Sequence, residues 1–187
     1  MRASSHPRRN RLKSIIGWRE FIGLPDLDIP QLRAKIDTGA RTSALHAVDI
    51  SVSEDGEARW VEFHVPLPGR PRHQRSRALI VDDRLIKNTS GIAEHRYVVE
   101  TTLVLGARHW RIEVSLADRE NMGFDIILGR TAIRTHGLLV NPGSSYLAGL
   151  PVQRASISSE PRHKSRSEKL PRGEFSPHIS LVKGDEL

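Results

Sequence analysis

Short runs of alternating apolar and polar residues, separated by turn signals, most constrain what this chain of 187 residues can fold into. Such runs fill residues 14–150, and two clear examples are residues 31–36 (QLRAKI) and 109–117 (HWRIEVSLA). A two-residue period puts alternate side chains on opposite faces of a strand, so that one face can be buried. Sequences such as SEDGE at residues 53–57 are typical of hairpin turns between strands.

One segment departs from the two-residue period. Residues 130–137 (RTAIRTHG) favour a short helix that ends at Gly137, a typical helix-terminating residue. Seven or more short strands with tight turns and a single helix favour a β-barrel or a β-sandwich. We therefore predict an all-β domain over residues 14–150.

The formal net charge of +7 is concentrated at the two ends of the chain. Residues 1–13 contain five Lys or Arg and no acid, and residues 151–187 contain seven bases and five acids. Residues 14–150 contain 17 bases and 17 acids, and are therefore neutral. We predict a basic disordered arm over 1–13 and a flexible basic tail over 151–187. The central domain does not have the charge of a nucleic-acid reader.

Several classes of function are excluded by residues and motifs that the sequence lacks. Without cysteine, the chain has no disulfides, Cys-ligated zinc, iron–sulfur cluster or cysteine nucleophile. No run of eighteen apolar residues predicts a transmembrane helix, and no export signal is visible. Phosphate-binding loops, zinc-binding H-E-x-x-H and nucleophile-elbow motifs are absent as well. We expect no metal, cofactor or membrane partner, and a cytoplasmic location in a bacterium.

The most informative motif is Asp-Thr-Gly-Ala at residues 37–40, directly after the apolar end of the strand predicted at 31–36. Asp-Thr-Gly alone is a common turn, because Asp bonds the nearby backbone and Gly accepts a positive φ. Here the acid projects from a predicted strand. About ninety residues later, residues 126–130 (IILGR) form a second apolar strand that turns at a glycine.

This pair of motifs resembles the retropepsin-like aspartic peptidases. The segments KIDTGARTSALHA, RYVVETTLVLG, ILGRTAI and SYLAG, within residues 15–150, further resemble a bacterial family long labelled "ATP-dependent zinc protease". That family includes RimB-type proteins, which are found near the RimK glutamate ligase. The resemblance implies a closed retropepsin-like β-barrel with one short helix. It also implies that Asp37 is catalytic, supported by Thr38, Gly39, Ala40, Gly129 and Arg130. The residues give no support to the zinc or ATP of the old label.

Peptide hydrolysis by aspartates needs two carboxyls about 3 Å apart that share one proton. The chain has one Asp-Thr-Gly, so the second carboxyl would come from the same residue of a second copy. A symmetric homodimer brings such residues together at its axis. Asp125 is the alternative within one chain, although a solvent-facing strand residue explains it more simply.

The resemblance also implies a hairpin flap over the cleft. Counting strands back from residues 126–130 puts its tip in residues 87–92, at Asn88, Thr89, Ser90 and Gly91. Small polar residues suit a lid that must open. An ordinary hairpin turn explains them equally well, and SEDGE at 53–57 is a competing flap candidate.

A loop within residues 66–77 carries four arginines, Arg70, Arg72, Arg75 and Arg77. A solvated basic loop is the simplest interpretation. The functional alternative is a docking surface for an acidic substrate, such as a Glu-rich or glutamylated tail.

Two residues depart from the family pattern. Many retroviral members have an acid directly after Asp-Thr-Gly-Ala, whereas this chain has Arg41. Arg130 must therefore find another partner. Asn141 stands where the bacterial relatives often have Asp.

Three functions remain open from the sequence. The leading hypothesis is a homodimeric aspartic endopeptidase that uses paired Asp37 carboxyls on peptides, including acidic or glutamylated ones. The first alternative is a non-catalytic module on the same barrel that binds extended peptides by strand pairing. The second alternative is a metal-dependent hydrolase, as the old label states.

Overall fold

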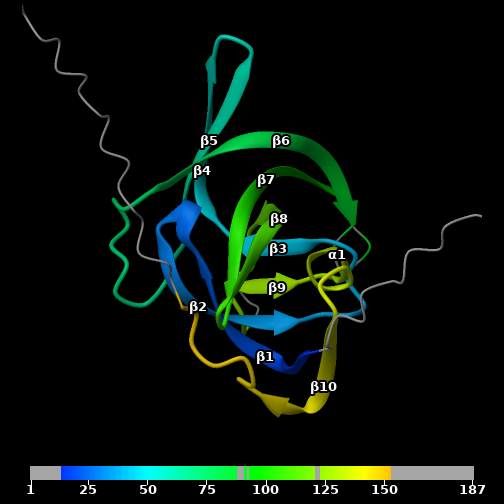
Figure 1. Ribbon diagram of the computed structural model, residues 1–187. Helices are drawn as coiled ribbons and strands as arrows, with labels where there is room; N and C mark the ends of the chain where they lie inside the picture. Colours follow the sequence, from blue (N-terminus) through cyan, green and yellow to red (C-terminus); the bar gives the residue numbers. More distant parts are fainter. Residues whose placement is uncertain (1–13, 88–90, 92, 121–122, 153–187) are drawn as a thin grey trace, which may run out of the picture. The chain divides into compact units, whose positions relative to one another are not determined.

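The computed structural model describes residues 14–87, 91, 93–120 and 123–152 (Figure 1). The predicted arm 1–13 and the tail from residue 153 onward lie outside the described residues. The described part contains β1 (Ser14–Leu24), the 3-10 helix η1 (Pro25–Leu27), β2 (Ile29–Ile36), β3 (Ser43–His46), β4 (Val48–Asp55), β5 (Ala58–His64), β6 (Ser76–Lys87), β7 (Ala93–Leu105), β8 (Arg108–Ala117), β9 (Ile126–Leu128), α1 (Arg130–Ile133) and β10 (Leu138–Ser145). This composition confirms the predicted all-β class with one short α-helix.

The strands pair in the order β10-β1-β2-β9-β3-β8-β7-β6-β5-β4. In addition, β1 pairs with β7 through Ile22 opposite Leu105. This pairing closes a ring of strands, in the order β1, β2, β9, β3, β8 and β7. In Figure 1, β6 arches above β7 and the other strands of the ring. That the ring is a closed retropepsin-like barrel stays a prediction.

The period-two pattern is visible in the burial of the strands. In β2, Leu32, Ala34 and Ile36 are buried, and the intervening residues are exposed. Burying a Leu or Ile side chain contributes about 1.5–3 kcal/mol each to stability. This inner face fixes the direction in which β2 ends, and therefore the position of the residues that follow it.

Two segments differ from the sequence expectation. The largely apolar stretch at residues 43–52 (SALHAVDISV) predicts one strand, but it forms β3 and β4, because the Ala47 amide bonds to the Ala117 carbonyl and Asp49 adopts a positive φ of 53°. β3 therefore joins the ring, whereas β4 pairs with β5 in the outlying hairpin. The helix is also shorter than expected, since α1 ends at Ile133 and turns lead on to Gly137.

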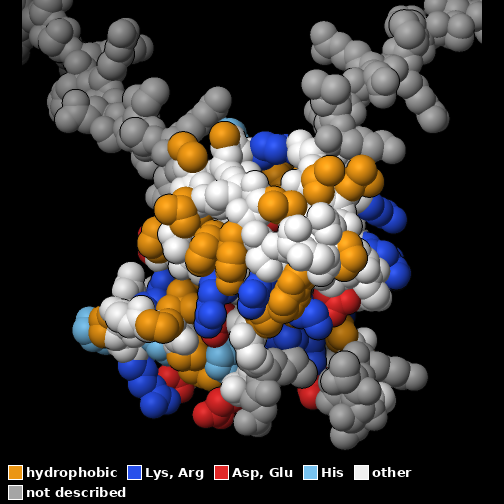
Figure 2. Space-filling model, turned by 90° about the horizontal axis from the view of Figure 1, so that it is seen from below, with side chains coloured by type: hydrophobic (Ala, Val, Ile, Leu, Met, Phe, Trp, Pro, Cys, Tyr) orange, Lys and Arg blue, Asp and Glu red, His pale blue; other side chains and the backbone are white. Residues whose placement is uncertain are grey.

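The edge formed by β1 and β10 lies at the bottom of Figure 1. Ile15 and Leu139 are paired there and are 57% and 46% exposed. Figure 2, which views the molecule from below, shows hydrophobic side chains at the surface among Lys and Arg side chains. Among the described residues, no helix has the length and apolar character needed to span a bilayer.

Candidate active site

Asp37 is the first residue after β2, and its position is fixed by β9. The two strands run parallel, with Ala34 opposite Ile126 and Ile36 opposite Leu128. The amide of Asp37 donates to the carbonyl oxygen of Leu128 at 2.9 Å. The two motifs recognised in the sequence are therefore neighbours in the sheet, and the Asp37 loop begins where β9 ends.

The two carboxylate oxygens of Asp37 have different surroundings. Oδ1 accepts hydrogen bonds from the amides of Gly39 and Ala40, each at 3.0 Å. Oδ2 accepts no hydrogen bond from the described residues. One oxygen therefore forms the turn that Asp-Thr-Gly commonly makes, while the other stays available for chemistry.

Gly129 lets the Asp37 loop and the end of β9 approach each other closely. A Cβ at Gly129 would lie 2.5 Å from the carbonyl carbon and oxygen of Thr42, closer than real contacts allow. The Gly129 amide also donates to Ser43 Oγ at 3.3 Å. Only glycine fits this position without moving the backbone of the loop.

Arg130 holds the other side of the same loop. Its amide donates to the Ala40 carbonyl at 2.9 Å, and its Nη1 lies 3.4 Å from the carbonyl oxygens of Thr38 and Gly39. The basic residue Arg41 is exposed and leaves this arrangement intact. The partner that Arg130 needed is therefore the backbone of the Asp37 loop itself.

A cleft of about 790 Å³ opens beside Asp37. The loop residues Gly39, Ala40, Arg41 and Thr42 line it, together with Trp18, Lys35, Asp37, Ala44, Ile86, Arg96, Ser115, Arg119, Gly123, Phe124 and Ile127. Trp18 and Phe124 meet edge to face, with ring centroids 5.9 Å apart. The cleft therefore combines an apolar wall with polar and charged groups, as binding sites commonly do.

The β6–β7 hairpin supplies part of this cleft wall through Ile86 and Arg96. At its tip, Asn88, Thr89 and Ser90 lie outside the described residues, and Gly91 is exposed with a φ of 79°. The competing β4–β5 hairpin, with SEDGE at its turn, contributes no residue to the cleft lining. This arrangement favours the β6–β7 hairpin as the flap, which stays a prediction.

The charge of the cleft was not anticipated from the sequence. Four cations line it, Lys35, Arg41, Arg96 and Arg119, whereas Asp37 is the one carboxylate among the described lining residues. Burial is the largest cause that lowers the pKa of Arg119; the charge of Arg96 lowers it further, and that of Asp37 opposes the shift. The sequence offers one signal for Arg119, because the stretch SLADR at residues 115–119 also resembles the bacterial family.

The four arginines of the predicted docking loop lie elsewhere and bind acceptors within the chain. Arg70 donates to the carbonyl oxygens of Leu27 and Asp28. Arg72 binds the Asp49 carboxylate, and Arg75 donates to the Asp49 carbonyl. Arg77 lies over the Trp60 ring. None of the four lines the Asp37 cleft. Their contacts are those of residues that hold a loop in place.

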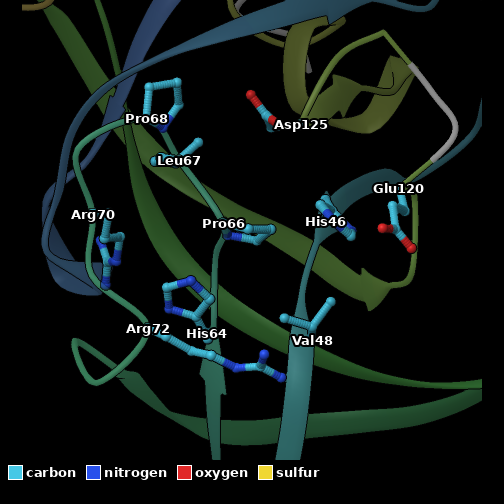
Figure 3. Close-up of a pocket in the computed structure, with 10 residues that line it drawn as sticks. All are labelled: His46, Val48, His64, Pro66, Leu67, Pro68, Arg70, Arg72, Glu120 and Asp125. Carbon is cyan, nitrogen blue, oxygen red and sulfur yellow. The ribbon is translucent and has the colours of Figure 1, made fainter.

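Arg70 and Arg72 instead line a second pocket of about 720 Å³ (Figure 3). Asp125 lines this pocket with His46 and His64, so the structure does not bring Asp125 into the Asp37 cleft. In the described part of the chain, no three His, Asp or Glu side chains gather as a metal site.

Asn141, which departs from the family pattern, forms a local hydrogen bond: its Oδ1 accepts from the Gly143 amide at 2.9 Å.

Comparison with known proteins adds three curated relatives. Each is named a probable alpha-L-glutamate ligase; the proteins from Parasynechococcus marenigrum, Desulfotalea psychrophila and Shewanella pealeana are 42%, 41% and 37% identical over 139, 132 and 139 residues. These matches cover 70–73% of this chain but only 28–30% of the relatives. The chain therefore spans less than a third of their length.

A solved structure, a Legionella pneumophila protein of unknown function, superposes with a TM-score of 0.60 and 28% identity. The match covers 72% of this chain and 98% of that protein. A family model described as RimB-like, retropepsin-like aspartic endopeptidase RimB, matches residues 15–151. With its Asp-Thr-Gly-Ala loop locked against Gly129 and Arg130, the chain belongs to the RimB-like family of retropepsin-like aspartic endopeptidases.

Proposed function

We propose that the protein is an aspartic endopeptidase that acts as a homodimer. The observation that carries this proposal is the Asp37 carboxylate beside an open cleft. Its Oδ1 is fixed by two amides, and its Oδ2 accepts no hydrogen bond from the described residues. A carboxylate that only formed a turn would not need a cleft next to it.

The second carboxyl of the catalytic pair would be Asp37 of a second copy. Thr38 and Gly39 are exposed at the tip of the loop and are small, so another loop can approach them. Two-fold symmetry then sets like carboxyls face to face, where they share one proton because both cannot stay ionised.

The reaction follows from that shared proton. The ionised carboxylate takes a proton from a water molecule, whose oxygen attacks the peptide carbonyl carbon, while the protonated carboxyl donates to the carbonyl oxygen. The tetrahedral intermediate then breaks its C–N bond. The proton held by the first Asp37 passes to the leaving amine, and the proton on the hydroxyl returns to the pair.

The cationic lining of the cleft supports acidic peptides as the substrate class. Four cations against one carboxylate concentrate anionic ligands at the site. The ligase names of the relatives fit substrates that carry added glutamate, as on a glutamylated protein tail. A cytoplasmic location is proposed with this substrate class.

A non-catalytic peptide-binding module is the second candidate. The observation in its favour is that this domain matches less than a third of relatives named as ligases, where an attached domain can serve to hold the acceptor peptide. Such a module would bind acidic peptides and leave them intact.

Mass spectrometry of a glutamate-rich peptide incubated with the purified protein separates these candidates. We expect wild type to cleave an internal peptide bond and Asp37→Asn to lose about a hundredfold or more in rate. Asp125→Asn, altered in the other pocket, is the matched control and should keep its activity.

Unchanged cleavage in the presence of a metal chelator is expected as well. Binding without cleavage by wild type would favour the module. Full activity of a folded Asp37→Asn variant would contradict the peptidase, and loss of activity with chelator would favour the metal-dependent hydrolase.

A further inference from the structure

Arg119 follows the end of β8, and its backbone is held in place. Its amide donates to Nδ1 of the buried His46 at 2.9 Å. The next amide, that of Glu120, donates to Asp118 Oδ1 at 3.0 Å. The turn after β8 is thus fixed on both sides of Arg119, while the Arg119 side chain lines the Asp37 cleft.

The guanidinium of Arg119 is unusually short of partners. Its Nε is buried and has no hydrogen bond within the described part of the chain. No described carboxylate, Asp37 included, lies within ion-pair distance of it. A buried donor without an acceptor normally costs stability, so one that persists beside a cleft points to an acceptor supplied by a ligand.

Arg96 stands on the facing hairpin strand and adds to the positive charge around Arg119. Its side chain is only 12% exposed and is held by Glu94, with 2.6 Å between Arg96 Nη2 and Glu94 Oε2. Burial is the largest cause that lowers the pKa of Arg119, and the positive charge of Arg96 lowers it further. Two guanidinium groups that repel each other are stabilised when an anion is bound near them.

We propose that Arg119, assisted by Arg96, is the specificity-determining residue of the cleft and binds a side-chain carboxylate of the peptide held beside Asp37. Arg119 Nε and the adjacent Nη can each donate a hydrogen bond to one oxygen of the same carboxylate, which is a bidentate arrangement. The subsite selects glutamate or aspartate over their amides, because a neutral amide cannot compensate the charge of the half-buried Arg119. This inference rests on the proposed function for the reaction, but concerns binding only.

Fluorescence anisotropy on the Asp37→Asn background tests the proposal without cleavage. The probes are a labelled hexaglutamate peptide and a labelled hexaglutamine peptide. We expect Arg119→Gln to weaken hexaglutamate binding about tenfold or more, with hexaglutamine binding unchanged. Arg119→Lys should recover part of the lost affinity, because it restores the charge without the bidentate edge. Arg33→Gln, an exposed β2 arginine outside the cleft, is the matched control.

Three binding results would overturn the proposal. Equal affinity of the Asp37→Asn protein for the two peptides, binding of neither, or an equal loss for both in Arg119→Gln would show that Arg119 does not read the carboxylate. Failure of the reaction is a separate result: if wild type cleaves nothing while these affinities behave as expected, the peptidase is wrong and the subsite stands. If the protein with Asp37 intact cleaves both peptides at equal rates, and Arg119→Gln does not change these rates, the peptidase proposal stands and the proposed Arg119 subsite is wrong.

Discussion

Gly129 lies so close to Thr42 that a Cβ at Gly129 would come within 2.5 Å of the Thr42 carbonyl oxygen. This contact joins the end of β9 to the segment that follows the Asp37 loop. It explains in physical terms why a glycine follows β9: any side chain at residue 129 would collide with the backbone after the Asp37 loop.

Gly129→Ala should therefore displace the loop. Because the obstacle is backbone, the clash cannot be relieved by a rotamer change, and we expect a loss of about 1–3 kcal/mol in the free energy of unfolding. Urea denaturation measures it. Gly143→Ala is the matched control, since its Cβ would meet only Asn141 Oδ1 at 3.4 Å; equal stability of both variants would contradict the packing described here.

The carboxylate of Glu20 holds the backbone of residues 147 and 148 in place. It is fully buried and accepts from the amides of Gly17 at 2.5 Å, Leu147 at 3.0 Å and Ala148 at 3.2 Å. Glu20→Gln turns one acceptor into a donor that faces an N–H group, so we expect a loss of about 1–3 kcal/mol in unfolding free energy. The control is Glu113→Gln at a half-exposed site. Identical urea midpoints for the Glu20 and Glu113 variants would argue against this role.

Arg72 controls the titration of Asp49. Two hydrogen bonds of 2.8 Å from Arg72 are the largest cause that lowers the Asp49 pKa. Since the folded pKa is the lower one, the stabilisation is present above the unfolded pKa and is lost as pH falls through the folded pKa. Arg72→Gln should raise the Asp49 pKa toward its ordinary value.

Carboxyl-detected NMR titration measures that change. Arg77→Gln in the same loop should leave the Asp49 pKa as it is, because Arg77 lies against Glu62 and Trp60. The stability of wild type and Arg72→Gln should differ at neutral pH and converge in acid. An unaltered Asp49 titration in Arg72→Gln would refute the assignment.

Much of the fold was predictable because strands leave a local trace. The alternation in residues 31–36 and 109–117 identified β2 and β8, since burial of one face imposes a two-residue period. The break at Ala47 was not predictable, because it depends on β3 pairing with the distant strands β8 and β9 while β4 pairs with the neighbouring β5. Local patterns carry no information on such pairing.

The site divides in the same way. Asp37 and Gly129 lie in short motifs that the sequence displays directly. Arg96 lies on β7 and Arg119 follows the end of β8, and the pairing of these two strands brings both residues to the cleft. The arginine-rich loop around Arg70 is conspicuous in the sequence for its charge, and in the structure the Arg70 side chain binds acceptors of the chain itself. Docking of an acidic substrate on this loop stays a prediction.

The paired-carboxyl account is tested most directly by the cleavage rate of a fixed amount of wild type mixed with increasing amounts of Asp37→Asn. If each active site takes one Asp37 from each of two copies, subunit exchange converts wild type into mixed dimers. We predict that the rate then falls toward zero as the variant is added in excess. A rate that stays constant at every ratio, with exchange verified by mass spectrometry, would contradict the claim that two Asp37 carboxyls share one site.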